Sequence, residues 1–200
     1  MTEPGQAFLA EPAAPSDAAV IGQSVADPER FAEIFDRHAD GIYRYAARRL
    51  GQQAAADVVS EVFLAAFRNR RRYDTCRTDA RPWLYGIAAN MISQHVRTQR
   101  RQASVLAAVP ATPPADVVAE EALGRVTAAR LRPLIVRALD QLSGDDRELV
   151  LLVAWAGLSY EQAAQALGIP LGTVRSRLHR IRAKLRRAVG PALSRPEVTS

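Results

Sequence analysis

Apolar residues recur every three or four positions along most of the chain, a spacing that predicts helices. In the first half, this pattern predicts three helices in succession. The first begins at Asp27-Pro28-Glu29, where a capping aspartate precedes a proline at the first helical position, and it ends at Gly51. The second spans about 54–72 and the third about 80–102. No segment shows sustained alternation of apolar and polar residues, so we predict no strands.

The last part of the chain predicts two short helices joined by a tight turn. Ser159 and Gln162 form a capping-box pattern at the start of the first helix, and Gly168 stands where a left-handed residue would end it. Pro170 is placed to start the second helix. The apolar stripe of that helix has spacings of four, three and four residues: Val174, Leu178, Ile181 and Leu185. This arrangement is typical of a helix-turn-helix, whose second helix enters the DNA major groove by its N-terminal residues.

Segments without helical periodicity set the expected domain boundaries. Residues 1–26 are rich in Ala, Pro, Glu, Ser and Gly and contain no basic residue, which predicts a disordered, mildly acidic tail. Residues 103–118 hold three prolines among small residues, which predicts a flexible linker. We therefore expect an all-α protein with two small helical domains, at 27–102 and 119–190, followed by a disordered tail at 191–200.

Positive charge is concentrated in two places. The net charge of +6 favours a polyanionic partner such as nucleic acid. Residues 170–187 carry seven basic residues and no acidic one, and the alternative to a DNA-binding helix there is a solvated basic face. Residues 68–101 carry nine arginines interleaved with Tyr73, Trp83 and Tyr85. These aromatic rings could stack on unpaired bases or belong to the core of the first domain, and composition alone does not decide between the two.

The sequence shows no catalytic constellation. The three histidines, His38, His95 and His179, lie far apart, and none belongs to a spaced metal-ligand cluster. Cys76 is the single cysteine, which excludes an intramolecular disulfide and a multi-cysteine zinc site. We expect no enzyme activity, no metal and no cofactor. No stretch reaches the length of a membrane span and no secretory signal pattern is present, so we expect a cytoplasmic protein without membrane insertion.

Together these segments resemble the extracytoplasmic-function (ECF) group of bacterial RNA polymerase sigma factors, within the sigma-70 family. The stretch GLSYEQAAQALGIPLGTVRSRLHRIRAKLR is similar to region four of that family. Upstream, AADVVSEVFLAAFRNRRRYD and RPWLYGIAANMISQHVRTQRR resemble successive parts of region two. FAEIFDRHADGIYRYAARRL, which precedes them, is a weaker match. The order of the segments makes the resemblance highly specific.

The resemblance implies three contact surfaces. One is the surface that reads the minus-thirty-five promoter element: Thr173, Arg175, Ser176, His179 and Arg180. Of these, Thr173 at the start of the helix is placed for a phosphate contact through its hydroxyl. A second, with the loop before it, opens and binds the minus-ten element: Trp83, Asn90, Gln94, Arg97, Arg100 and Arg101. A third binds the clamp helices of the polymerase largest subunit: Asp57, Val58, Glu61, Val62 and Phe63. The implied partners are the polymerase core, at its clamp helices and flap, promoter DNA and an anti-sigma factor.

These observations favour a sigma factor that binds the polymerase core and then recognises and melts promoters. The alternative is a stand-alone helix-turn-helix regulator, which normally dimerises on two half-sites. Such a regulator has no need for the docking segment at 57–63 or for the helix that carries Trp83. A nucleic-acid-modifying enzyme has the right charge but lacks a catalytic constellation. Because core must present both domains together, we predict weak promoter affinity for the free protein.

Overall fold

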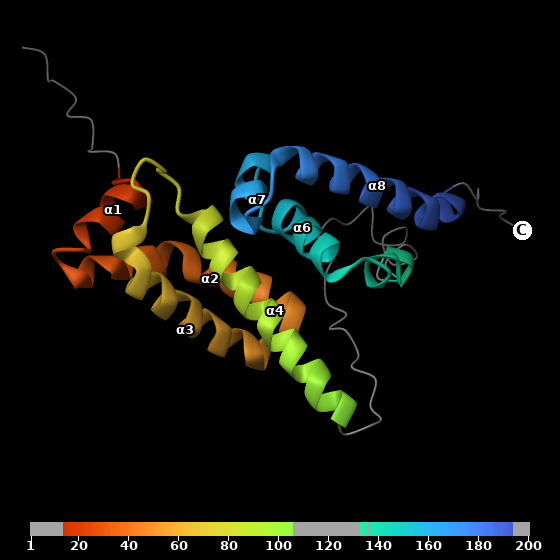
Figure 1. Ribbon diagram of the computed structural model, residues 1–200, viewed down its shortest axis with the longest axis horizontal. Coiled ribbons are helices and arrows are strands. Elements are labelled where there is room, and N and C mark those ends of the chain that lie inside the picture. The colour runs from red at the N-terminus through yellow and green to blue at the C-terminus, as the bar shows by residue number, and fades with distance from the viewer. Residues whose placement is uncertain (1–13, 106–132, 136, 194–200) are drawn as a thin grey trace, which may run out of the picture.

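The computed structural model describes residues 14–105, 133–135 and 137–193, and all regular secondary structure in those ranges is helical (Figure 1). The α-helices are α1 (Asp17–Gln23), α2 (Ala32–Leu50), α3 (Gln52–Asn69), α4 (Arg81–Val105), α6 (Gly144–Ala154), α7 (Tyr160–Leu167) and α8 (Leu171–Leu193). Two short 3-10 helices, η1 (Pro28–Phe31) and η2 (Arg70–Arg72), precede α2 and follow α3. The all-α prediction is confirmed.

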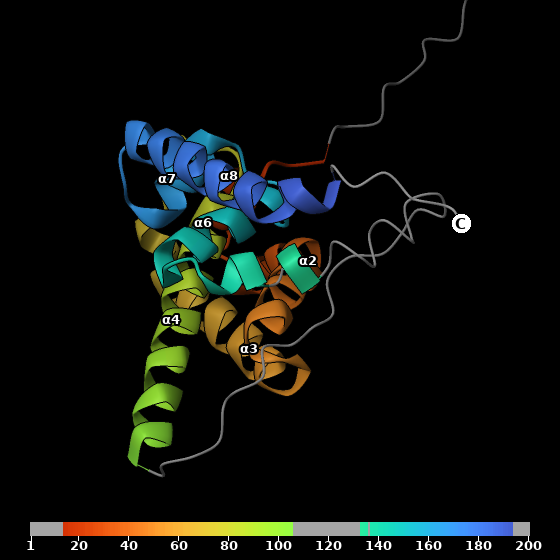
Figure 2. The same cartoon turned by 90° about the vertical axis from the view of Figure 1, so that its right-hand side faces the viewer.

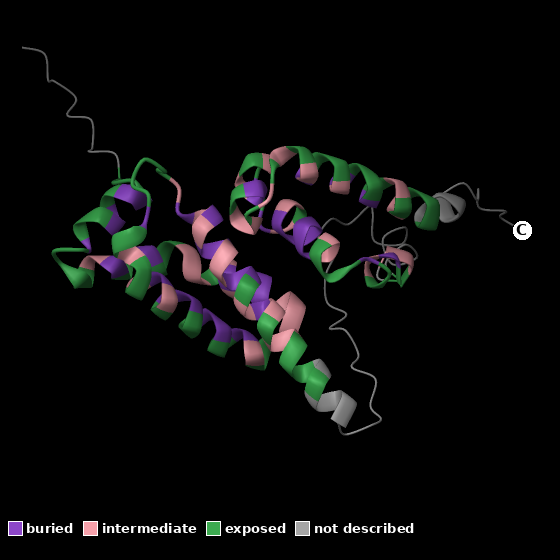
Figure 3. Ribbon diagram, in the orientation of Figure 1, coloured by how far each residue is buried: buried purple, intermediate pink, exposed green. Residues whose placement is uncertain are grey.

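The first group of helices, α1 to α4, packs around α2 and α3. These two helices lie against each other, and Gly51 joins them with a φ of 85°, a left-handed value that favours glycine. Ile34 and Ile42 of α2 and Val62 of α3 are all fully buried in one core. Leu84 of α4 is fully buried in the same core. Figure 3 shows buried segments along α2, α3 and α4. Burying each large apolar side chain contributes about 1.5–3 kcal/mol, which holds the three helices together.

The second group, α6 to α8, has the predicted helix-turn-helix geometry. The Ser159 side chain accepts a hydrogen bond from the Gln162 N–H at 3.1 Å, and Gln162 Oε1 accepts one from the Ser159 N–H at 2.8 Å. Gly168 ends α7 with a φ of 63°. Ser143 caps α6 in the same way, accepting a hydrogen bond from the Asp146 N–H. These predicted helix ends are confirmed.

The prediction of a disordered tail over 1–26 is wrong for its second half. Residues 17–23 form α1, which Ser16 caps by accepting a hydrogen bond from the Ala19 N–H at 3.3 Å. Val20 and Ile21 are fully buried in the same core as α2 and α3. The overall composition of residues 1–26 predicted disorder because it does not reveal the burial of these two side chains, which holds α1 against the core. Residues 1–13 lie outside the described residues.

Other predicted boundaries shift by a few residues. Asp27 makes no side-chain capping bond, and Pro28 opens the 3-10 turn η1, so α2 begins only at Ala32. Helix α4 continues to Val105, beyond the predicted end at 102, and α8 continues to Leu193. The rest of the predicted linker and the last seven residues of the predicted C-terminal tail lie outside the described residues.

The two groups of helices are in contact. Helix α4 lies against α7 and, over a smaller area, against α6 (Figures 1 and 2). The sequence predicted two domains joined by a tether but no contact between them. No helix in the described ranges is long and apolar enough to cross a membrane.

Candidate functional site

Helix α8 presents a polar and basic face to solvent. Its predicted apolar stripe is buried at Val174, Leu178 and Ile181, which turns the opposite side outward. That side holds four of the predicted base-reading residues, all exposed: Arg175, Ser176, His179 and Arg180. The fifth, Thr173, is half-buried, and its carbonyl accepts a hydrogen bond from the Ser176 hydroxyl at 3.1 Å. The structure therefore brings the predicted residues together on the first turns of one helix.

The basic side chains of α8 differ in the contacts that they make within the second group of helices. Arg175 lies 3.8 Å from Glu161 of α7, and both side chains are largely exposed, so this pair contributes little stability. Arg182 donates a hydrogen bond to the Tyr160 hydroxyl and lies over its ring. Arg180 is exposed beside His179 and carries no such contact to an acidic side chain in the described part of the chain. Of these arginines, Arg180 is thus the cation most available to a polyanion.

A second polar stripe runs along α4. At 100° per residue, positions 83, 90, 94, 97 and 101 fall within about 40° of one line along the helix. Asn90, Gln94, Arg97 and Arg101 are exposed. The side chain of Arg100 lies outside the described residues. The α4 stripe, defined as positions 83, 90, 94, 97 and 101, is therefore exposed from Asn90 onward, on the part of the helix that projects beyond the core, and Trp83 at its start is half-buried.

The three aromatic residues near α4 have different environments. Tyr73 and Tyr85 are buried, and the Tyr85 ring meets the Tyr45 ring edge-on at 5.2 Å. Both tyrosines therefore belong to the core, which was the alternative the sequence left open. Trp83 is half-buried and tilts against the Tyr73 ring at 4.9 Å. One side of the Trp83 ring thus packs against the buried Tyr73, and Trp83 is also the first position of the α4 stripe.

The loop between η2 and α4, residues 73–80, is folded by its own hydrogen bonds. The Tyr73 hydroxyl donates to the Arg77 carbonyl at 2.6 Å. Asp74 accepts a hydrogen bond from the Cys76 N–H and pairs with Arg77 at 3.1 Å. Burial raises the pKa of Tyr73 to about 12, so its hydroxyl stays a donor at physiological pH. The side chains at positions 74–78 point to solvent, including the free thiol of Cys76.

The predicted docking segment on α3 divides into an outer and an inner face. Asp57 and Glu61 are exposed, but Val58, Val62 and Phe63 are buried in the core. In this structure the exposed members of the predicted docking segment are Asp57 and Glu61, and the other three side chains lie beneath them in the core. The reason is the helical repeat, which places 58 and 62 one turn apart on the face that packs against α2.

Two exposed apolar residues that the sequence analysis missed lie on α3 and on the neighbouring helix α2. Leu64 of α3 is 47 % exposed and Phe35 of α2 is 44 % exposed. The Phe35 ring packs edge-on against the buried Phe63 ring at 4.9 Å, which fixes its position. Position 64 follows 57 and 61 at helical spacing, so the same repeat that assigns the inner face would have identified it. We call Phe35, Asp57, Glu61 and Leu64 the α3 outer face.

A set of contacts that we call the seam joins the two groups of helices. Arg49 Nη2 of α2 lies 3.1 Å from Glu148 Oε2 of α6, and the two side chains are only 10 % and 5 % exposed. Gln162 Nε2 donates to Asp79 at 2.7 Å, and Arg81 donates to the Ala156 carbonyl. The remaining contacts place the Arg48 guanidinium 5.5 Å from the Trp155 ring centroid, and Gly86 directly against Ala166.

The seam also gathers like charges. A cleft of about 360 Å³ lies between the two groups, and its lining includes four arginines but a single acidic residue: Arg37, Arg44, Arg48, Arg81 and Asp40. Burial and the nearby Arg44 lower the pKa of Arg48. Burial also raises the pKa of Glu148 to about 8. Burying these charged groups at the seam costs free energy, so the closed arrangement of the two groups of helices is held by contacts that are partly offset by charge burial.

Within the described residues, no group of three or more His, Cys, Asp and Glu side chains could hold a metal ion. His38 contacts Asp17 at 2.8 Å and His95 contacts Gln99 at 3.0 Å. His179 is exposed on α8.

Comparison with protein families gives two matches. Residues 34–102 match Sigma-70 region 2, and residues 132–185 match Sigma-70, region 4. Similar curated proteins include the ECF RNA polymerase sigma factor SigL of Mycobacterium tuberculosis, which is 36 % identical over 81 % of this chain and 90 % of its own length. RNA polymerase sigma factor CarQ of Myxococcus xanthus is 33 % identical over 81 % of this chain and 90 % of its own. SigW of Bacillus subtilis is 31 % identical over 80 % and 89 %.

Two solved structures have a similar fold. CnrH in complex with the cytosolic domain of CnrY has a TM-score of 0.61 at 25 % identity, covering 88 % of this chain and 97 % of that chain. The sigma factor RpoE in complex with the anti-sigma factor NepR from Bartonella quintana has a TM-score of 0.60 at 23 % identity, covering 80 % and 96 %.

Proposed function

Because the chain belongs to the ECF group of RNA polymerase sigma factors, it directs transcription initiation, and we propose which surface makes each contact. The exposed face of α8 reads the minus-thirty-five element. The α4 stripe and loop 73–80 bind bases of the minus-ten element. The α3 outer face binds the clamp helices of the polymerase largest subunit. The observation that carries this proposal is that most residues of each set are exposed, and that the sets lie on separate parts of the fold: the first turns of α8, α4 with the loop before it, and the outer side of α2 and α3.

Promoter melting would follow from capture of unstacked bases by the loop and the α4 stripe. Trp83 suits this role because a half-buried ring with a fixed back offers a stacking surface at low entropic cost. Asn90 and Gln94 lie one turn apart farther along the α4 stripe, with amide groups that can both donate and accept hydrogen bonds. This process needs no catalytic group and no nucleotide hydrolysis by the chain itself.

Promoter binding requires the seam to open. The two promoter elements are centred about 25 base pairs apart, or about 85 Å at 3.4 Å per pair. A chain whose α4 touches α7 cannot place the α4 stripe and the α8 face on both elements at once. The described structure is therefore a closed state, and the polymerase core, by binding each half separately, would favour the open state. This gives a structural reason for weak promoter affinity in the free protein.

Further partners follow from the same surfaces. The helix-turn-helix group would bind the polymerase flap when it is released from the seam. An anti-sigma factor is a proposed partner because the similar structures of CnrH and RpoE are each complexes, with CnrY and with the anti-sigma factor NepR. A stand-alone regulator would leave the α3 outer face and the α4 stripe without a role.

Transcription by purified polymerase core on genomic DNA tests the proposal. Adding the full chain should raise initiation well above core alone. Arg180→Ala should reduce that stimulation, because it removes a cation from the α8 face. Arg186→Ala is the matched control, since Arg186 is also exposed but lies six residues, or about 9 Å, farther along the same helix, away from its first turns. Equal effects of the two substitutions would contradict the assignment of the α8 face, and no stimulation despite intact core binding would contradict the function.

A further inference from the structure

Helix α1 lies outside the segment that matches Sigma-70 region 2, yet it is part of the fold. The match begins at residue 34, whereas α1 spans Asp17–Gln23. Val20, Ile21 and Ser24 are fully buried, and Ser24 donates its hydroxyl proton to the Ile21 carbonyl at 2.6 Å. The segment therefore packs as an ordered part of the first group of helices.

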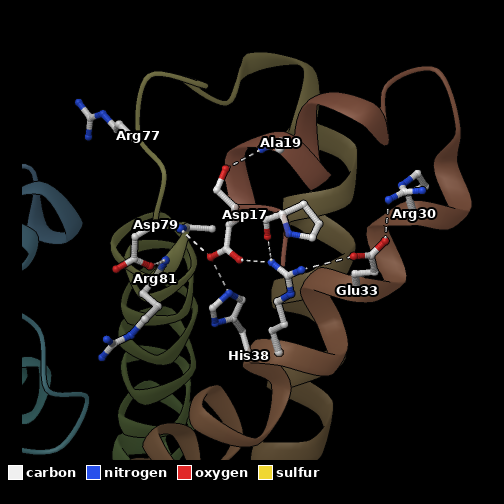
Figure 4. A network of polar contacts seen from close by, with 12 residues as sticks. Asp17, Ala19, Arg30, Glu33, His38, Arg77, Asp79 and Arg81 are labelled. Carbon is white, nitrogen blue, oxygen red and sulfur yellow. Dashed lines mark hydrogen bonds and ion pairs between the residues drawn. The ribbon is translucent and has the colours of Figure 1, made fainter. Parts of the chain in front are cut away.

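The first residue of α1 places a carboxylate at the base of loop 73–80. Asp17 Oδ2 accepts a hydrogen bond from the Ala80 N–H at 3.0 Å and lies 2.8 Å from His38 Nε2 (Figure 4). Asp17 Oδ1 accepts a hydrogen bond from Arg37 at 3.0 Å, and Arg37 also donates to the Pro15 carbonyl. Burial alone would raise the pKa of Asp17, but the Ala80 N–H, His38 and Arg37 outweigh it and hold that pKa below its ordinary value.

These contacts fix the point where the loop becomes helix α4. The Ala80 carbonyl accepts the hydrogen bond from the Leu84 N–H that starts the helix, while the Ala80 N–H points to Asp17. Asp79 caps the next residue, accepting a hydrogen bond from the Arg81 N–H at 2.8 Å. Without Asp17, the buried Ala80 N–H would lack its acceptor, and the loop end would be free to move.

The same segment also holds the other end of the loop. Arg70 in η2 donates through Nε to the Ser24 carbonyl at 3.1 Å, and its guanidinium stacks on the Phe67 ring at 3.8 Å. Between these two attachment points, the side chains at 74–78 are exposed. The segment 17–24 thus binds the residues before and after the loop and leaves its tip to solvent.

We infer that Asp17 is a positioning residue for promoter opening, acting through loop 73–80. This inference rests on the proposed role of that loop in binding the minus-ten element. A loop that is already ordered loses less conformational entropy when it captures a base, so binding of single-stranded DNA is tighter. Asp17 touches no base itself. Its effect reaches DNA through the backbone of Ala80 and the start of the α4 stripe.

The test compares Asp17→Asn with a matched control in the same helix, Gln23→Ala, whose side chain is exposed. Asparagine keeps the size of the side chain but removes the charge that three donors share. In hydrogen exchange on the full chain, Asp17→Asn should speed amide exchange of residues 74–80 at least tenfold and leave α2 and α3 unchanged. Gln23→Ala should change neither.

The functional readout uses holoenzyme, formed from polymerase core and the full chain, and a pool of single-stranded DNA with randomised sequence. Wild-type holoenzyme should enrich a minus-ten sequence, and Asp17→Asn should weaken binding to the enriched DNA at least tenfold. Affinity for core and for duplex DNA carrying only the upstream element should stay within twofold. A general loss of stability would lower all three affinities together, because α1 shares its core with α3.

Arg37→Gln provides a milder second variant, because it removes one donor to Asp17 and keeps the Ala80 and His38 contacts. It should produce a smaller loss in the same selective pattern. Unchanged exchange of loop 73–80 in both variants, or unchanged binding of the enriched DNA, would overturn the inference. If wild-type holoenzyme enriches no sequence at all, the proposed role of the loop fails instead.

Discussion

Replacing Gly86 by alanine should open the seam while strengthening the helix that carries it. Gly86 lies inside α4, and a Cβ built there would stand 2.7 Å from the Ala166 carbonyl oxygen and 3.4 Å from the Ala166 Cα. Ordinary contact begins near 3.4 Å, so the two backbones must separate by about 0.7 Å. The obstacle is a backbone carbonyl, which cannot rotate away as a side chain would.

The two effects of this substitution have opposite signs. Overpacking a close contact costs about 1–3 kcal/mol, and here the cost falls on the closed state alone. That range corresponds to an approximately 5- to 150-fold fall in the ratio of closed to open molecules. Alanine also has a helix propensity about 1 kcal/mol better than glycine, a gain that both states share. Gly86→Ala should therefore favour the open state without lowering the stability of the first group of helices.

Distance measurement between two spin labels or dyes on the full chain would detect the change. Cys76 is the single cysteine and is exposed, and a second label at Lys184→Cys would report on α8, where Lys184 is exposed too. Gly144→Ala is the matched control, because nothing lies within 4 Å of a Cβ at that glycine. A distance distribution for Gly86→Ala identical to that of wild type would refute the reasoning, as would a shift of equal size in Gly144→Ala.

Further predictions concern charge, docking and the thiol. Burial raises the pKa of Glu148 to about 8 in the closed state, so that state binds an extra proton and should lose population as pH rises toward 8, measured with the same labels. Glu148→Gln should abolish this pH dependence; an unchanged slope would contradict it. Leu64→Asp should weaken core binding in titration at least tenfold, yet shift the free energy of unfolding by about 0.5 kcal/mol or less because Leu64 is exposed. Cys76→Ser should leave any response of transcription to oxidant unchanged; a lost response would identify the thiol as a sensor.

The features that sequence predicted well are local ones. The Ser159 and Gln162 capping box and the turn at Gly168 depend on residues within ten positions of one another, so their pattern is visible along the chain. The buried stripe of α8 is equally local, since one helical repeat determines which side faces the core. The exposed face at Arg175 and Arg180 then follows directly.

The features that sequence reasoning missed depend on distant partners. Asp17 contacts His38 and Ala80, which are 21 and 63 residues away in the sequence. The small residues around Asp17 form no pattern that indicates these partners. The seam is similar, because Gly86 and Ala166 meet through their lack of bulk and not through an apolar pattern. For α3 the family resemblance implied one contact surface over residues 57–63. The helical repeat, which is visible in the sequence, instead places Val62 in the core and Leu64 on the exposed side.

The most direct measurement of the central claim is to map the 5′ ends of transcripts made by purified core and the full chain on genomic DNA. A sigma factor with two separate DNA-binding surfaces should start transcription at sites that share one element near minus ten and another near minus thirty-five, with a fixed spacing between them. Arg180→Ala should relax the upstream element, and Asn90→Ala should relax the downstream one. Start sites without a shared downstream element, or sites marked only by symmetric half-sites, would contradict the claim.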